Sequence, residues 1–245
     1  MNAVICGATS GMGRALARLL AERKSAIVLM ERPGDDLERS ARDLEQRGAS
    51  GTVGTVACDL GDPSGFAAAF DAAQQQLGRI DVVILTAAAF GTQDQLEADI
   101  DLALRLCTIN FANTVVWCEH ARKRLLAQGG GTLCVFSSVA GDRGRKPVGI
   151  YGAGKAGLSH YLESLDHKYR ASGLVTVTVK PGFVKTAMTA ALKPPPFAGE
   201  PEAVARRVLR AIEAGKPVVY APWIWRWILF VIKLLPRFVM RRINF

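Results

Sequence analysis

The stretch VICGATSGMGRAL, residues 4–16, connects a short apolar run to a helix-like run through three glycines, Gly7, Gly11 and Gly13. Glycine has no Cβ atom, so it permits a tight turn and lets another molecule approach the backbone closely. If the apolar run is a strand, the turn leads into a helix N-terminus, whose unpaired N–H groups and dipole attract phosphate. The spacing predicts a strand, a phosphate-binding turn and a helix; a tight turn in a glycine-rich protein is the alternative.

Apolar runs alternate with helix-like stretches along the rest of the chain. Strands are predicted at residues 3–6, 26–30, 51–57, 81–86, 132–136, 175–179 and 218–220. These runs are β-branched and continuously apolar, as expected when helices cover both faces of a sheet. The pattern predicts an α/β fold of the doubly wound Rossmann type, with about seven parallel strands in one domain over residues 1–220. Residues 187–201, which include three consecutive prolines, are expected to form a loop or lid.

Composition narrows the class of protein. The chain has 245 residues, 49% of them hydrophobic, which is enough for one well-buried core. The net charge is +9, of which +5 belongs to residues 221–245, so the basic surface is local and does not indicate nucleic-acid binding. The five cysteines include no C-x-x-C pair, which predicts reduced, buried thiols in a cytoplasmic protein and no metal site. No secretory signal precedes the first predicted strand.

The end of the second predicted strand is where a dinucleotide's adenosine ribose would be held. Glu31 lies there and can accept hydrogen bonds from both ribose hydroxyls, but it would repel the 2′-phosphate of NADP. Arg32 would do the reverse, or it is a solvated surface charge. The first position favours NAD, with NADP as the alternative. Asp59 follows the third strand, where it can contact the adenine or cap a helix.

Tyr151 and Lys155 are four residues apart at the start of a predicted helix, so both point to one face. An ammonium near a phenol favours the phenolate, so Lys155 is expected to lower the tyrosine pKa. Such a tyrosine can give a proton to a carbonyl oxygen or take one from an alcohol. Ser138 ends the fifth strand and can polarise the same oxygen. Their common place at the sheet edge predicts a catalytic set.

Asn110 occupies a long apolar helical pattern, LRLCTINFANTVV, where asparagine is a poor helix former. A buried amide requires hydrogen-bond partners. Asn110 can hold a water that delivers protons to Lys155, or it can be a satisfied core amide, and this residue alone favours neither.

These landmarks together resemble the short-chain dehydrogenase/reductase family over residues 2–220. The resemblance implies NAD(P)-dependent hydride transfer between a carbonyl and a secondary alcohol, in a homodimer or homotetramer. It implies Asn110, Ser138, Tyr151 and Lys155 as the catalytic residues. It implies that Lys155 also holds the nicotinamide ribose. The cofactor-binding residues that it implies are Gly7, Thr9, Ser10, Gly11, Met12, Gly13, Glu31, Arg32, Asp59, Leu60, Ala87, Tyr151, Lys155, Pro181, Gly182, Val184 and Thr186.

One segment departs from the family pattern. Residues 85–90 read LTAAAF, where the family usually has an Asn-Asn-Ala-Gly run. The side chains that remain are small, so access for the cofactor is expected to survive. The structural role of the missing asparagine is left open.

Two further features concern the substrate. Arg143, Arg145 and Lys146 crowd the loop between Ser138 and Tyr151, where they can grip a phosphate or carboxylate or form a solvated charged loop. Residues 221–245 are rich in tryptophan and aliphatic residues, with recurring arginine and lysine. This tail is expected to lie flat on the inner face of a membrane as a roughly continuous helix, or to pack on protein.

The tail and loop resemble those of the reductase in the decaprenyl-phosphoryl ribose epimerase pair, which implies a keto-sugar on a polyprenyl phosphate as substrate. Two other functions stay open. One is reduction of a 3-oxoacyl thioester on an acyl carrier, which the basic loop would also favour. The other is a non-catalytic, nucleotide-sensing, membrane-associated protein, since a fold alone does not establish turnover.

Overall fold

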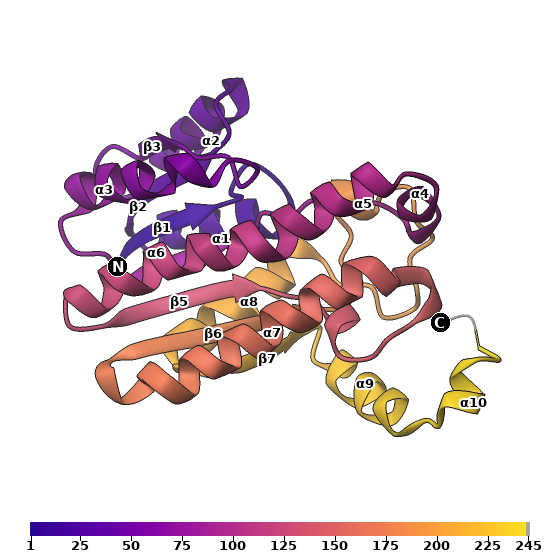
Figure 1. Ribbon diagram of the computed structural model, residues 1–245. Helices are drawn as coiled ribbons and strands as arrows, with labels where there is room; N and C mark the ends of the chain where they lie inside the picture. Colours follow the sequence, from indigo (N-terminus) through magenta and orange to yellow (C-terminus); the bar gives the residue numbers. More distant parts are fainter. Residues whose placement is uncertain (244–245) are drawn as a thin grey trace.

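The computed structural model describes residues 1–243, apart from the side chain of Asp35. The final two residues of the predicted tail, Asn244 and Phe245, lie outside the described residues. The sheet consists of seven parallel strands in the order β3-β2-β1-β4-β5-β6-β7 (Figure 1). Their bounds are β1 Asn2–Cys6, β2 Ala26–Glu31, β3 Gly54–Ala57, β4 Val82–Leu85, β5 Gly131–Phe136, β6 Leu174–Pro181 and β7 Val218–Ala221. The predicted fold is confirmed, although β3 begins three residues later than expected.

Helices cover both faces of this sheet, as the continuously apolar strands require. Alternate residues of a strand point to opposite faces. Ala3 and Ile5 of β1 therefore join one core layer, and Val4 and Cys6 join the other. The first layer is closed by α1 (Gly11–Glu22), α2 (Asp35–Gln46) and α8 (Pro201–Glu213). The second is closed by α3 (Phe66–Leu77), α6 (Thr114–Ala127) and α7 (Gly149–Tyr169).

The long apolar pattern around Asn110, residues 104–116, is helical throughout, as predicted. It covers the end of α5 (Ile100–Cys107), a π-helical stretch, Thr108–Asn113, and the start of α6; a short helix, α4 (Gln93–Ala98), precedes α5. π-Helical turns inside helices are rare and often mark functional sites. The prediction of buried cysteines is wrong for Cys107, which is exposed on α5. Cys6, Cys58, Cys118 and Cys134 are buried, and all five are free thiols.

The tail forms two short helices, α9 (Ile224–Leu234) and α10 (Arg237–Met240), where a roughly continuous helix was expected. The expectation is wrong because Leu235 adopts an extended conformation, φ −64° and ψ 130°, before Pro236. Proline disfavours the helical region for the residue that precedes it. Among the described residues, no helix has both the length and the apolar character needed to cross a bilayer.

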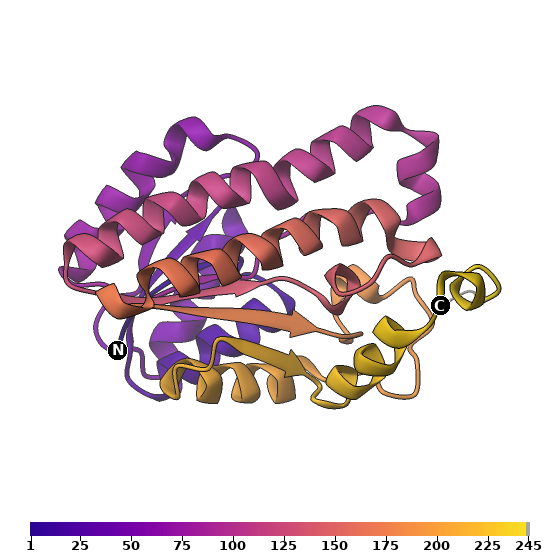
Figure 2. The ribbon, with the colours of Figure 1, turned by 60° about the horizontal axis from the view of Figure 1, so that its bottom comes forward.

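All strands of a parallel sheet end at the same edge, and this edge carries the candidate site. Helices α9 and α10 lie beyond the carboxyl ends of β5, β6 and β7, as two views of the ribbon show (Figures 1 and 2). The segment between β6 and α8 contains one 3₁₀ turn, Ala187–Thr189, and is otherwise irregular, which matches the predicted loop.

Candidate active site

The glycine turn lies between β1 and α1. Gly7 and Gly11 have φ values of +95° and +50°, which favour glycine because other residues rarely adopt them. A Cβ atom on Gly7 would overlap the backbone nitrogen of Ala87, and one on Gly13 would overlap the Gly7 carbonyl oxygen. These two glycines are therefore needed for packing within the protein. Gly11 faces the side chain of Thr186 and keeps the start of α1 open.

A cavity of about 460 Å³ opens above this turn. Most of the predicted cofactor-binding residues line it: Gly7, Thr9, Ser10, Gly11, Met12, Gly13, Glu31, Arg32, Asp59, Leu60, Ala87 and Thr186. Pro181, Gly182 and Val184 are not among its lining residues, and neither are the four predicted catalytic residues. The size of the cavity, the bare backbone and the helix N-terminus fit a dinucleotide with its phosphates at the turn.

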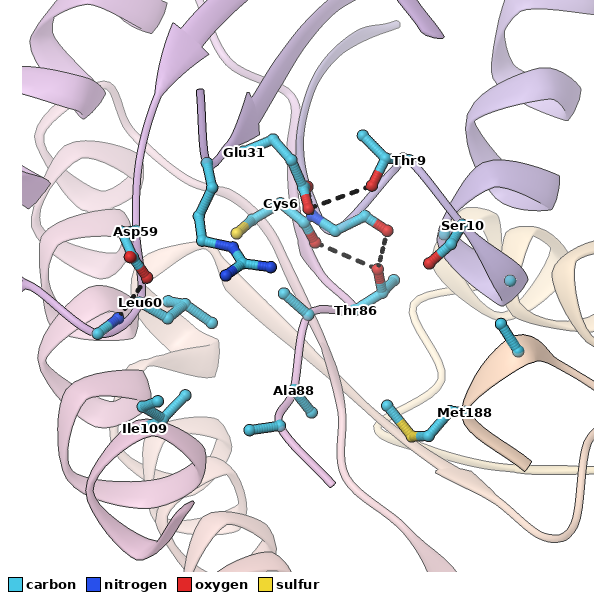
Figure 3. A pocket seen from close by; sticks show the side chains of 18 of the residues that line it. Cys6, Thr9, Ser10, Glu31, Asp59, Leu60, Thr86, Ala88, Ile109 and Met188 are labelled. Atoms are coloured by element: carbon cyan, nitrogen blue, oxygen red, sulfur yellow. Dashed lines mark hydrogen bonds between the residues drawn. The ribbon is translucent and has the colours of Figure 1, made fainter. Parts of the chain in front are cut away.

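Glu31 reaches from the end of β2 into this cavity (Figure 3). Its carboxylate accepts hydrogen bonds from the Gly7 backbone N–H at 2.8 Å and from the Thr9 hydroxyl at 3.3 Å. Burial raises the pKa of Glu31, and these two hydrogen bonds oppose that rise. The carboxylate thus fixes the glycine turn as well as contributing a negative charge to the cavity wall.

Thr86, just after β4, ties this strand to the glycine turn and was not predicted from the sequence. Its hydroxyl lies 2.8 Å from the Gly7 carbonyl oxygen and 3.2 Å from that of Cys6 (Figure 3). Thr86 is the second residue of the LTAAAF segment, in which the expected asparagines are missing. The sequence signal that could have identified Thr86 was a hydroxyl side chain at the end of a predicted strand.

Other lining residues come from segments that the sequence analysis did not connect with the site. Leu102, Arg105, Leu106 and Ile109 approach from α5 and the π-helical stretch. Arg105 and Arg32 are the two cations among the lining residues. Asp59 accepts a hydrogen bond from the Gly61 backbone N–H at 2.8 Å, so its carboxylate shapes its own loop at the cavity wall.

Three of the four predicted catalytic side chains, those of Ser138, Tyr151 and Lys155, lie close together at the end of β5. The side chains of Tyr151 and Ser138 are neighbours, and Ser138 acts to lower the pKa of Tyr151. Ser138 also accepts a hydrogen bond from the Ala140 backbone N–H at 3.1 Å, which holds its hydroxyl at the strand end. The Lys155 ammonium lies 5.7 Å from the centre of the Tyr151 ring and donates to the Phe136 carbonyl oxygen at 2.8 Å. Phe90 packs edge-on against the Tyr151 ring.

The expectation that Lys155 lowers the pKa of Tyr151 is wrong in this structure. Burial raises the pKa of Tyr151 to about 12, and the neighbouring Ser138 side chain opposes the rise. The Lys155 ammonium is directed to the Phe136 carbonyl oxygen. Burial also lowers the pKa of Lys155, to about 8, since its charge is held away from water.

Asn110 lies in the π-helical stretch and is buried. Its amide nitrogen donates to the Ala89 carbonyl oxygen at 2.8 Å, and its oxygen accepts from the Ala89 backbone N–H at 2.8 Å. Both polar atoms of the amide therefore have hydrogen-bond partners, as expected for a satisfied core amide. The proposed proton relay through Asn110 stays a prediction.

The basic loop makes a different connection from the one expected. Arg143 donates to the Leu235 carbonyl oxygen at 2.9 Å, and Lys146 donates to that of Arg241 at 2.8 Å. These two cations contact the tail in this structure, and the expectation that the loop grips a substrate anion stays a prediction. Leu235 and Arg241 are the residues at which α9 and α10 end. Carbonyl oxygens at a helix C-terminus lack partners within the helix and attract cations.

The family model described as short chain dehydrogenase matches residues 1–196. The chain belongs to the short-chain dehydrogenase/reductase family. Membership makes it an oxidoreductase that acts on CH–OH groups with a nicotinamide dinucleotide, which favours an enzyme over the non-catalytic alternative.

Relatives within the short-chain dehydrogenase/reductase family cover nearly the whole chain. An uncharacterized oxidoreductase of Mycobacterium tuberculosis is 34% identical over 239 residues, which is 98% of this chain and 95% of the relative. The cis-4-hydroxycyclohexanecarboxylate dehydrogenase of Sinomonas cyclohexanicum is 33% identical over 78% of this chain and 76% of its own. A solved short-chain type dehydrogenase/reductase from Mycobacterium ulcerans has the same fold, with a TM-score of 0.81 and 24% identity over 89% of this chain and 86% of its own.

Proposed function

We propose that this enzyme transfers a hydride reversibly between NAD(H) and a carbonyl or secondary alcohol, with Ser138, Tyr151 and Lys155 as its catalytic residues. The observation that supports this assignment is the group of neighbouring side chains at the end of β5, in which Ser138 adjoins Tyr151 and the Lys155 ammonium lies 5.7 Å from the centre of the Tyr151 ring, near a glycine-turn cavity large enough for a dinucleotide. The nicotinamide, when bound, supplies or accepts the hydride. The protein positions the substrate oxygen and moves the proton.

Tyr151 is the proposed acid in reduction. With its pKa at about 12, the phenol is protonated at neutral pH and can give its proton to a carbonyl oxygen. Ser138 orients that oxygen through its own hydroxyl. In the direction of alcohol oxidation, Tyr151 must lose its proton, and an ammonium that turns from the Phe136 carbonyl toward the phenol would favour the phenolate.

The cofactor that we propose is NAD rather than NADP. Glu31 holds a carboxylate in the cavity wall through two hydrogen bonds, and that negative charge would repel a 2′-phosphate. Arg32 and Arg105 are the lining cations that could offset the repulsion. The fixed position of the carboxylate supports the preference for NAD.

The substrate class that we propose is a lipid-linked carbonyl compound, such as a keto-sugar. The tail supports this class, because α9 packs on Val139, the residue after Ser138, and leaves an apolar face exposed. Reduction of a 3-oxoacyl thioester on an acyl carrier is the alternative, because the basic loop with Arg143 and Lys146 would favour either anionic substrate. Parallel screens of ketones with NADH and NADPH would identify the substrate and the preferred cofactor.

Tyr151→Phe tests the catalytic assignment. The variant keeps the buried ring but removes the proton donor, so kcat should fall by about 10³-fold while the Kd for NADH stays nearly unchanged. Ketone-dependent oxidation of NADH and fluorescence titration of NADH measure the two quantities. Tyr169→Phe, at the far end of the same helix, is the matched control and should retain activity. Full turnover by Tyr151→Phe would refute the role of Tyr151.

A further inference from the structure

Helix α9 has two apolar faces. Trp225, Leu229 and Ile232 are buried against the domain, where they form a small core with Val139 and neighbouring side chains. The other face points to solvent: Trp227 and Phe230 are each 55% exposed and Leu234 is 69% exposed. One face is sufficient to attach the helix to the domain, so the second face requires a different explanation.

The exposed face extends beyond α9 at both ends. We call it the tail surface and define it by its exposed apolar residues: Trp223, Trp227, Phe230, Val231, Leu234 and Phe238. Scattered exposed apolar residues are normal, but a contiguous patch with several aromatic rings marks an interaction site. The tail surface includes two tryptophans, which favour the interface between water and hydrocarbon because one side of the ring is polar.

A basic cavity of about 320 Å³ adjoins the tail surface and shares Trp223 and Trp227 with it. Its four cations come from three elements that the fold brings together: Arg207 and Arg210 of α8, Lys216 before β7, and Arg226 of α9. Its lining contains no carboxylate. Within the part of the chain that the structure describes, none of the four cations forms an ion pair.

The guanidinium of Arg207 is fixed by a hydrogen bond from its Nε to the Tyr220 carbonyl oxygen at 2.7 Å. The Arg226 guanidinium lies 5.9 Å from the centre of a ring of Trp227, so a cation of the cavity and an aromatic of the tail surface are neighbours. Exposed and unpaired cations that converge on a concave site offer several donors to one anion, as phosphate recognition requires.

We propose that the tail surface and the basic cavity together dock this enzyme on an anionic bilayer, with a phospholipid headgroup phosphate in the cavity and the aromatic rings at headgroup depth. The apolar residues supply burial and the cations supply attraction to the negative surface. The combination of the two chemistries favours a bilayer over a second copy of the chain, because the cavity's cations would face no acidic partner on the matching tail surface of that copy. The docking does not depend on the reaction, so it is tested without turnover.

The experiment is co-sedimentation of the full chain with large unilamellar vesicles. One set contains phosphatidylcholine only, and the other contains equal parts of phosphatidylcholine and phosphatidylglycerol. The wild type should sediment with the anionic set and remain in solution with the neutral set. The double substitution Trp227→Ser with Phe230→Ser should weaken binding at least about tenfold. Arg210→Gln with Lys216→Gln should weaken it about 25-fold, or about fivefold for each cation removed.

Matched control variants carry substitutions of the same kinds elsewhere on the surface of the protein. Ile100→Ser with Leu104→Ser replaces two exposed apolar residues of α5, and Arg42→Gln with Lys123→Gln removes two exposed cations elsewhere. Both controls should bind anionic vesicles as the wild type does. Circular dichroism and the NADH Kd establish that every variant is folded, so a wrong assignment of the reaction would leave this result unaffected.

Three outcomes would overturn the proposal. The first is equal sedimentation of the wild type with both vesicle sets, or with neither. The second is binding by the tail variants that equals binding by the controls. The third is a change of molar mass in lipid-free solution, measured by light scattering, when Trp227 and Phe230 are replaced, because the surface would then be a contact between copies of the chain.

Discussion

Lys155 illustrates how a single residue is changed by its surroundings. Its side chain is buried, and its ammonium is held by one carbonyl oxygen, that of Phe136. An ordinary lysine has a pKa of about 10.4, whereas burial lowers the pKa of Lys155 to about 8. Keeping this charge inside the protein therefore costs folding free energy at neutral pH.

The first prediction concerns the stability of the protein as a function of pH. Between about pH 8 and pH 10 the unfolded chain keeps the Lys155 proton and the folded chain loses it, so the free energy of unfolding rises with pH. The free energy of unfolding of the wild type, minus that of Lys155→Met, should increase by about 2 kcal/mol over this range. Urea unfolding at several pH values measures it. Lys168→Met, at the exposed end of the same helix, is the matched control. A wild-type advantage that shrinks as pH rises would contradict the burial argument.

The second prediction concerns cofactor choice at Glu31. Glu31→Gln keeps an oxygen that can accept from Gly7 and Thr9, but it removes the negative charge. The ratio of kcat/KM for NADPH to that for NADH should rise about tenfold, because one unit charge near the 2′-phosphate is lost. Steady-state kinetics with both cofactors measure the ratio. Glu163→Gln, on the exposed side of α7, is the control; an unchanged ratio in Glu31→Gln would mean that the carboxylate does not select the cofactor.

Between elements, hydrogen bonds from side chains set how the strand ends meet. Thr86 joins the end of β4 to the glycine turn after β1, and Asn110 joins the π-helical stretch to Ala89. Both contacts involve the LTAAAF segment: Thr86 belongs to it, and Asn110 binds the backbone of Ala89 within it. Backbone groups at the sheet edge that strands leave unpaired require partners of this kind.

Thr86→Val is the prediction at this scale. Valine has nearly the shape of threonine but cannot donate to the Gly7 carbonyl, so the glycine turn should loosen. The free energy of unfolding should fall by about 1 kcal/mol, and the Kd for NADH should rise several-fold with little change in kcat. Thr86→Ser keeps the hydroxyl and should restore NADH affinity. If the serine variant binds NADH as weakly as the valine variant, the hydroxyl is not what positions the turn.

Asp142 connects the loop after β5 to two other elements. Its carboxylate is almost fully buried, pairs with Lys180 at 2.6 Å and accepts a hydrogen bond from the Tyr220 hydroxyl at 2.7 Å. Lys233 of α9 lies 3.5 Å from the same carboxylate. Burial, together with this hydrogen bond, raises the pKa of Tyr220. A buried carboxylate with three partners from β6, β7 and α9 fixes the start of the tail against the sheet.

Across the whole molecule, the tail is part of the folded domain as well as an exposed surface. Trp225 lies against Gly182 so closely that a Cβ atom there would overlap its ring, and its indole N–H donates to the Phe197 carbonyl oxygen at 3.3 Å. Gly182 was expected to contact the cofactor. The structure shows that its missing side chain makes room for the tail, and its contact with the cofactor stays a prediction.

Trp225→Ala tests this integration. Removing a buried tryptophan should cost about 4 kcal/mol and lower Tm by about 10 °C in a chain of this size. Trp227→Ala, two residues along the same helix but on its exposed face, should change stability by less than about 0.5 kcal/mol. Differential scanning calorimetry compares them. Similar losses from both substitutions would mean that α9 is not anchored through one face.

The sequence by itself determined the fold class, the positions of the seven strands and the glycine turn, because apolar periodicity and glycine spacing are local properties of the chain. It also predicted half of the residues that line the cavity, since strand ends in a parallel sheet share one edge. Only the tertiary structure decided what those residues contact. Arg143 and Lys146 bind carbonyl oxygens 92 and 95 residues away, and Lys155 is directed to a carbonyl 19 residues before it. Burial and hydrogen-bond partners depend on such distant pairs, which no local pattern specifies. They set the pKa values of Tyr151 and Lys155 and decide which face of α9 is buried.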